Sequence, residues 1–87
     1  MAKARKNLAK HGISFDEAAT VFGDPLGASV RDPDHSLGED RYITIGLSDR
    51  FRLIIVSHAD HHDRVRIISA RQLTRAEKKT YEEETRA

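Results

Sequence analysis

The sequence predicts a single α+β domain, residues 1–87, in which two helices precede an antiparallel sheet of three to four strands and one helix follows it. Capping motifs typical of helix starts occur near both ends of the chain. Between them, β-rich runs follow one another across turns that are too short for helical crossovers. A chain of 87 residues has room for one small hydrophobic core and no second domain.

The first two helices are predicted from the residues at their ends. Residues 3–11 are expected to form a short helix that stops at Gly12, because glycine readily adopts the left-handed conformation that closes helices. Ser14–Glu17 matches a capping box and predicts a second helix to about Phe22. Gly23–Pro25 ends that helix, since glycine and proline both interrupt the helical pattern.

Strands are predicted through the middle of the chain. A short strand at 27–31 precedes a turn-rich loop at Asp32–Ser36. Three further strands, joined by short turns at 47–50 and 60–63, are expected to form an antiparallel meander: 41–45, 51–58 and 64–71. A second capping box at Thr74–Glu77 starts a C-terminal helix that runs into Glu84.

Composition excludes several classes of protein. The chain has no cysteine, so neither disulfides nor a thiolate zinc site stabilise it. Its longest apolar run, Leu53–Val56, is far shorter than the roughly 20 residues that a membrane-spanning helix needs. Residues 1–5 lack the hydrophobic segment of a signal peptide. We therefore expect a soluble, cytoplasmic protein that does not bind membranes.

The charges are segregated, although the formal net charge is only +1. Residues 1–12 carry four bases and no acid, and residues 13–49 carry eight acids and two bases. Residues 50–81 carry eight bases and three acids. This distribution indicates either a basic face that attracts a polyanion or an ordinary solvated surface.

The hairpin between the last two predicted strands is the candidate site. If its turn falls at His61-His62, Arg52 lies opposite Arg71 and His58 lies opposite Val65. One face of the hairpin then carries the following side chains: Arg52, Ile54, Val56, His58, Val65, Ile67, Ser69 and Arg71. Two adjacent arginines repel each other unless a phosphate lies between them or an acid from a helix neutralises them. Both alternatives are open at this point.

Two further side chains are candidates near that face. The C-terminal helix, folded over the sheet, would return the Tyr81 phenol to the two arginines for proton transfer or base stacking. His58 on the same face is a candidate general base. The cluster His58–Asp63 offers imidazoles and carboxylates but matches no standard metal-ligand spacing, so we expect neither a metal nor another cofactor.

Motifs along the whole chain resemble those of the BrnT family of bacterial toxins. The resemblance begins at Lys10–Ala18 and continues at Asp24-Pro25 and at Asp32–Ser36, followed by Glu39 and Arg41. The later matches are these: Thr44-Ile45-Gly46, the run Arg66–Arg71, Thr74, Glu77, Tyr81 and Glu82. The run Ile-Ser-Ala-Arg ahead of a Thr-x-x-Glu helix start is the most specific of them.

The resemblance implies a RelE-like ribonuclease toxin of a type II toxin–antitoxin system. Such a toxin inhibits translation and is neutralised by a cognate, BrnA-like antitoxin, which also contacts operator DNA. The implied reaction is attack of the ribose 2′-hydroxyl on the adjacent phosphate without a metal, with Arg71 on the phosphate and Tyr81 in proton transfer. Arg52, Arg66 and His58 are supporting candidates, although Arg66 points to the opposite face in the assumed register. The remaining bases expected to contact RNA are Arg50, Arg64, Arg75 and Lys78.

The sequence departs from the family at its start, where members carry an additional N-terminal strand. Without that strand we expect an exposed sheet edge, open to a second copy or to strand exchange. Two other functions stay open: a non-catalytic module that docks the antitoxin as a co-repressor, and hydrolysis by a metal held by His58 and His61. Retained antitoxin binding without cleavage would indicate the first, and loss of activity in EDTA would indicate the second.

Overall fold

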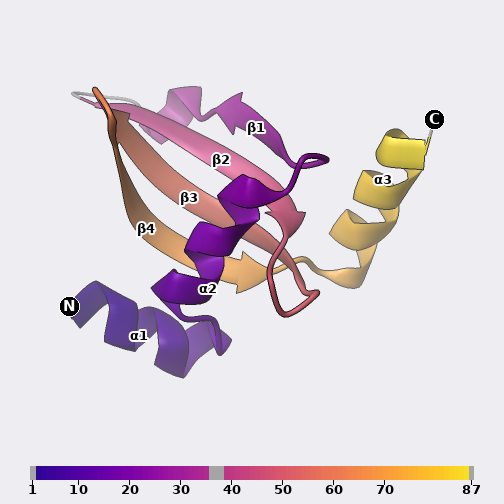
Figure 1. The fold of residues 1–87 in the computed structure, drawn as a ribbon, viewed down its shortest axis with the longest axis horizontal. Coiled ribbons are helices and arrows are strands. Elements are labelled where there is room, and N and C mark those ends of the chain that lie inside the picture. Colours follow the sequence, from indigo (N-terminus) through magenta and orange to yellow (C-terminus); the bar gives the residue numbers. More distant parts are fainter. Residues whose placement is uncertain (1, 36–38, 87) are drawn as a thin grey trace.

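The computed structural model describes residues 2–35 and 39–86, and their chain path confirms the α+β class (Figure 1). The helices are α1 (Ala2–His11), α2 (Phe15–Thr20) and α3 (Arg75–Arg86), with short 3₁₀ turns η1 (Val21–Gly23) and η2 (Pro33–His35). The strands are β1 (Ala28–Arg31), β2 (Asp40–Leu47), β3 (Leu53–His61) and β4 (Arg64–Gln72). They form one antiparallel sheet in the order β1-β2-β3-β4.

The two N-terminal helices begin and end where their capping residues predict. Gly12 has a φ of 70°, and its amide bonds the Leu8 carbonyl at 2.8 Å to close α1. The Ser14 hydroxyl accepts from the Glu17 amide at 3.0 Å and caps α2. The predicted continuation of α2 to Phe22 is wrong in detail, because the chain tightens into the 3₁₀ turn η1 after Thr20.

The hydrophobic core lies between these helices and one face of the sheet. Its fully buried members are Ile13, Ala18, Val21, Ile54, Val56 and Ala70. α1 and α2 pack against β4, and η1 packs against β2 (Figure 1). Side chains alternate along a strand, so the next residues on β3, such as Ile55, belong to the other face of the sheet, which we call the open face.

The Asn7 side chain links α1 to the edge strand β4 by hydrogen bonds. Its side-chain nitrogen donates to the carbonyls of Ala70 at 2.8 Å and Ile13 at 2.9 Å, and its oxygen accepts from the Ala70 amide at 2.9 Å. The residue is buried, with 6% of its surface exposed. One side chain thus satisfies three backbone groups, one at the helix junction and two on the edge strand.

The register of the last hairpin differs from the predicted one. His62 has a φ of 58° and lies in the turn, and Ile55 faces Arg71, whereas His58 faces Ile67. An irregularity in the pairing at Ser57/His58 leaves an extra residue on β4, which is a β-bulge. Beyond the bulge Ser69 and Arg71 therefore lie on the open face, whereas Ile54, Val56 and His58 lie on the helix-covered face. The predicted grouping on one face is therefore wrong for Ser69 and Arg71, whereas Ile54, Val56, His58 and Ile67 share a face as predicted.

α3 extends beyond the end of the sheet (Figure 1), and its Tyr81 lines a small hollow there together with Leu47 and Leu53. The Thr74–Glu77 capping box forms as predicted, with the Glu77 amide bonding Thr74 Oγ1 at 3.2 Å and the Thr74 amide bonding Glu77 Oε1 at 2.9 Å. Within the described residues, no helix has the length and apolar character to cross a membrane.

Candidate functional site

Arg52 lies on the helix-covered side of the sheet and binds Glu17 of α2. Its Nε is 2.9 Å from Glu17 Oε2, and its Nη2 contacts both Glu17 Oε1 and the Gly12 carbonyl. The Glu17 side chain is buried and also accepts from Ser48 Oγ at 2.7 Å. Its bonds to Arg52 and Ser48 hold the pKa of this carboxyl below the usual value, against the effect of burial. The predicted position of Arg52 opposite Arg71 is wrong.

Arg71 lies on the open face and pairs with Glu77 at the start of α3. The two guanidinium nitrogens are 2.8 and 3.0 Å from the two Glu77 oxygens, a bidentate arrangement. Glu77 thereby binds the arginine and caps the helix at the same time. For both predicted arginines, an acid from a helix is the neutralising partner, which was one of the two alternatives left open by the sequence.

The Glu77 pair predicts a pH dependence of stability in acid. Arg71, followed by the bond from Thr74, lowers the pKa of Glu77 from 4.5 to about 2. A carboxyl with a lowered pKa stabilises the folded state above its unfolded-state pKa, and loses that contribution as pH falls through the folded-state value. The contribution is therefore complete above pH 4.5 and is lost toward pH 2. Thermal unfolding followed between pH 2 and 6 should show a shallower acid decline for Glu77→Gln; an unchanged slope would contradict this.

Tyr81 points away from the arginines. Its hydroxyl donates to the Leu26 carbonyl at 3.0 Å, in the loop ahead of β1. Partial burial, and secondarily the charge of Asp24, raise the pKa of the phenol. The predicted convergence of Arg52, Arg71 and Tyr81 is therefore wrong in geometry, because each side chain is held by a different partner.

His58 is buried under the helices and has both ring nitrogens engaged. Nε2 lies 2.7 Å from Thr44 Oγ1 and Nδ1 lies 2.8 Å from Asp60 Oδ1. The ring also contacts Phe22 edge-on and stacks on Tyr42, with centroids 4.8 and 5.8 Å away. A carboxylate only accepts, so Nδ1 carries a proton, and Nε2 shares a hydrogen bond with the Thr44 hydroxyl. His58 has 3% of its surface exposed and lies on the helix-covered side with Arg52, not on the open face with Arg71.

Arg66 lies at a different place on the open face, across a hollow from Glu39. Its Nη2 is 2.8 Å from each Glu39 oxygen, and Arg41 Nε donates to Glu39 Oε1 at 3.2 Å. The hydrogen bond from Arg66 lowers the pKa of the Glu39 carboxyl most, and the hydrogen bond from Arg41 lowers it further. One carboxylate is therefore kept anionic between two guanidinium groups.

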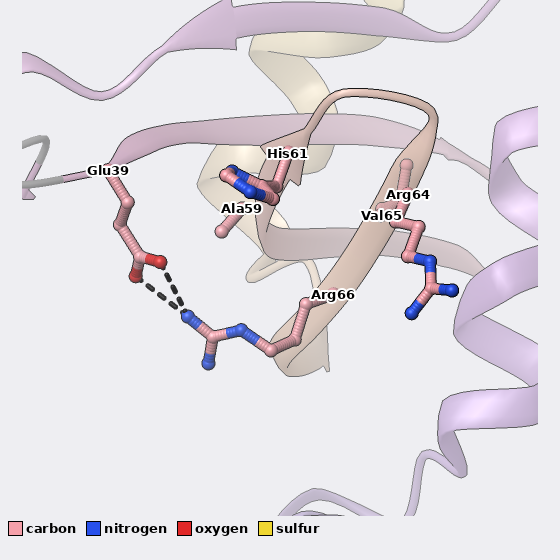
Figure 2. A pocket seen from close by; sticks show the side chains of 6 residues that line it. All are labelled: Glu39, Ala59, His61, Arg64, Val65 and Arg66. Atoms are coloured by element: carbon pink, nitrogen blue, oxygen red, sulfur yellow. Dashed lines mark hydrogen bonds and ion pairs between the residues drawn. The ribbon is translucent and has the colours of Figure 1, made fainter.

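The hollow, which we call the hairpin hollow, has a volume of about 590 Å³ and lies beside the β3–β4 turn. It is lined by Glu39, Ala59, His61, Arg64, Val65 and Arg66. Figure 2 shows Arg66 extended from β4 to Glu39, with the His61 ring above the same space. Arg64 also lines the hollow but directs its guanidinium away from Glu39 (Figure 2). A carboxylate, an imidazole and guanidinium groups thus meet at one solvent-accessible place.

A second, smaller hollow is lined in part by open-face residues of β2, β3 and β4. Its volume is about 190 Å³, and it is lined by Asp32, Arg41, Tyr42, Ser57, Ile68 and Ser69. Arg41 joins the two, because it lines the smaller hollow and bonds Glu39 at the rim of the larger one. The open face is therefore cationic and polar at its hairpin end.

The basic residues expected to contact RNA separate into two groups. Arg64 lines the hairpin hollow. Arg50 lies in the β2–β3 turn at the opposite end of the strands, and Arg75 and Lys78 are exposed on α3. Of these four basic residues, Arg64 is therefore the one that lines the hairpin hollow.

Sequence reasoning missed three residues as site residues: Glu39 and His61, which line the hairpin hollow, and Arg41, which bonds Glu39. Glu39 and Arg41 stood in the family motifs, which was a signal for them, but no role was assigned to either. His61 was considered only as a metal ligand. Within the described residues, no group of three or more His, Asp or Glu side chains is arranged to hold a metal ion.

The chemistry of the hollow suits a phosphodiester. Guanidinium groups bind phosphate oxygens and stabilise charge that develops on them, and a carboxylate and an imidazole can each transfer a proton. No protein in the curated collection matches this chain. The family model for BrnT, the ribonuclease toxin of a type II toxin–antitoxin system, matches residues 1–77, a segment that includes every residue of the hollow. The chain therefore belongs to the BrnT family of ribonuclease toxins, which act in type II systems with a partner antitoxin.

Proposed function

We propose that this protein cleaves RNA at the hairpin hollow by attack of a ribose 2′-hydroxyl on the adjacent phosphate, without a metal ion. The observation that carries this is the Glu39 carboxylate held between Arg41 and Arg66 in a hollow that His61 also lines. The family supplies the substrate class, RNA.

In the proposed reaction Glu39 is the general base. When the scissile phosphate binds the Arg66 guanidinium, Glu39 loses the hydrogen bond that contributes most to its lowered pKa. The Glu39 carboxylate then becomes more basic beside the 2′-hydroxyl. The hydroxyl proton passes to Glu39 as the 2′-oxygen forms its bond to phosphorus. Arg66 and Arg41 stabilise the negative charge that builds on the phosphoryl oxygens.

His61 is the proposed general acid. Imidazole exchanges protons near neutral pH, and the exposed His61 side chain lines the hollow. The bond from phosphorus to the 5′-oxygen breaks, and that oxygen takes a proton from the imidazolium. The products are a 2′,3′-cyclic phosphate on one fragment and a 5′-hydroxyl on the other. Every proton and bond is thus accounted for by side chains of the hollow.

The other predicted site residues have different roles in this scheme. We assign Arg64 and Arg71 to phosphates that flank the scissile one, because both belong to the hairpin strand that carries Arg66. Arg50, Arg75 and Lys78 would contact RNA farther along. Arg52, His58 and Tyr81 carry no step, since their polar atoms are bonded to Glu17, to Thr44 and Asp60, and to Leu26. Cleavage would inhibit translation, and a BrnA-like antitoxin that binds operator DNA would neutralise it.

Analysis of the cleavage products tests this mechanism. The purified protein is incubated with a defined RNA oligonucleotide in the presence and absence of EDTA, and the fragment ends are determined by mass spectrometry. We expect equal rates under both conditions and 2′,3′-cyclic phosphate ends. Fragments with 5′-phosphates, or activity that EDTA abolishes, would contradict the mechanism, and a folded protein without cleavage would favour the non-catalytic antitoxin-binding module.

A further inference from the structure

The open face of the sheet carries an apolar surface that the two N-terminal helices do not cover. Directly paired residues share a face, so the register places these side chains together on it: Ala28, Val30, Ile43, Ile45, Leu47, Leu53 and Ile55. Val30 is 61% exposed and Leu47 38% exposed, whereas Ile43, Ile45, Leu53 and Ile55 are half-buried. At one end of this surface, Tyr81 of α3 lies beside Leu47 and Leu53. Contiguous exposed apolar surface of this kind typically marks a binding site.

This apolar surface leads along the open face to the proposed cleavage site. Along β3 the open face changes from Ile55 through Ser57 to Ala59, and their partners on β4 are Arg71, Ser69 and Arg66. Ala59 lines the hairpin hollow, and Ser57 and Ser69 line the smaller one. A partner that binds the apolar surface therefore lies beside the Glu39 carboxylate and the two arginines that pair with it.

The charge distribution indicates what kind of occupant fits. Three arginines of the open face lie near these apolar side chains: Arg41 on β2, and Arg66 and Arg71 on β4. RNA can bind the arginines but gains little from contact with isoleucine side chains. A protein segment with acidic and apolar residues can bind both the arginines and the apolar surface. A second copy would bring its own arginines against these, which is unfavourable.

We propose that the open face is the docking surface of the antitoxin, through an amphipathic segment that is apolar over Val30, Ile43 and Ile45 and acidic over Arg66 and Arg41. Such a segment covers the hairpin hollow and competes with the phosphate for both guanidinium groups. That docking blocks cleavage rests on the proposed function, whereas the position of the docking surface does not.

Val30→Asp tests the surface without touching the hollow. Its matched control is Leu8→Asp on α1, which places the same charge at an apolar residue of similar exposure, 51% against 61%, on the helix layer. The antitoxin, co-produced from the neighbouring reading frame and then separated, is titrated onto each variant by calorimetry, and RNA cleavage is measured in parallel. Circular dichroism checks that each variant folds, and Ala28→Asp on the same face replaces Val30→Asp if the latter does not.

We expect Val30→Asp to weaken antitoxin binding at least about tenfold while cleavage persists, and Leu8→Asp to change neither. Val30→Lys should weaken binding less than Val30→Asp, because the proposed segment is acidic. Equal affinity of wild type and Val30→Asp would overturn the docking surface. It would also be overturned if Val30→Asp lost RNA cleavage with antitoxin binding intact, or if it only abolished self-association of the protein.

The two proposals fail separately in these measurements. If the wild-type protein cleaves no RNA, the proposed function is wrong, but the affinities of the variants still locate the antitoxin. If cleavage follows the proposed mechanism and the affinities do not respond to Val30, the docking surface alone is wrong.

Discussion

Replacing Glu39 by glutamine is expected to reduce the single-turnover rate of RNA cleavage by about 10²–10⁴-fold, the usual contribution of a general base. The amide has nearly the same shape as the carboxylate but does not accept the 2′-hydroxyl proton. RNA binding should be retained or become tighter, because Arg66 and Arg41 lose the anion that now occupies them. The rate at saturating RNA and the dissociation constant, measured separately, distinguish this pattern from a loss of binding.

Glu77→Gln is the matched control for that substitution. Glu77 also forms a bidentate pair with an arginine of β4, but it belongs to α3 and does not line the hairpin hollow. The folded fraction of this variant should cleave RNA at nearly the wild-type rate. Equal losses in Glu39→Gln and Glu77→Gln would show that breaking any arginine pair on this sheet impairs the protein, and would remove the argument for a base at Glu39.

The second large effect is expected at Asn7 and concerns stability. Asn7→Ala leaves the Ala70 amide, the Ala70 carbonyl and the Ile13 carbonyl without their partner. A buried backbone group left unpaired costs about 1–3 kcal/mol, so the free energy of unfolding should fall by roughly 3 kcal/mol or more. For a domain of this size that corresponds to a melting temperature lower by about 12–24 °C.

Denaturant and thermal unfolding of Asn7→Ala measure this loss. Lys6→Ala, at an exposed position of the same helix, is the control and should leave the unfolding free energy nearly unchanged. A loss below about 1 kcal/mol in Asn7→Ala would mean that water replaces the side chain at the β4 edge, and that Asn7 does not hold α1 on the sheet.

The elements of the fold were predictable because their signals are local. Ser14 and Thr74 each cap the helix that their motif predicts, and Gly12 ends α1 with a positive φ. The short turns between β-rich runs predict the antiparallel meander, which the strand order β1-β2-β3-β4 confirms. These features depend on neighbours within about four residues of each other in sequence.

The face on which each hairpin side chain lies was not predictable. The bulge on β4 near Ser57 and His58 adds one residue to that strand, and a shift of one residue moves every later side chain to the other face. Nothing in the run Arg66–Arg71 signals a bulge, since its β-branched residues suit a regular strand equally well. This single shift explains why Arg71 and His58 lie on different faces.

The partners of Arg52 and Arg66 are likewise long-range features. Glu17 and Arg52 are 35 residues apart in sequence, and Glu39 and Arg66 are 27 apart. Pattern reasoning identified Arg52 and Arg71 as charges needing a partner but had no means of choosing which acid binds which arginine. The packing of α2 and the course of the chain into β2 make that choice.

A side-by-side measurement of RNA cleavage by Arg66→Ala and Arg52→Ala tests the location of the site most directly. Both substitutions remove an arginine from a carboxylate, but Arg66 lies over the hairpin hollow and Arg52 lies under α2. Per folded molecule, the single-turnover rate should fall by at least about 10²-fold in Arg66→Ala and stay near wild type in Arg52→Ala. The reverse order, or equal rates in the two variants, would contradict cleavage at the open face.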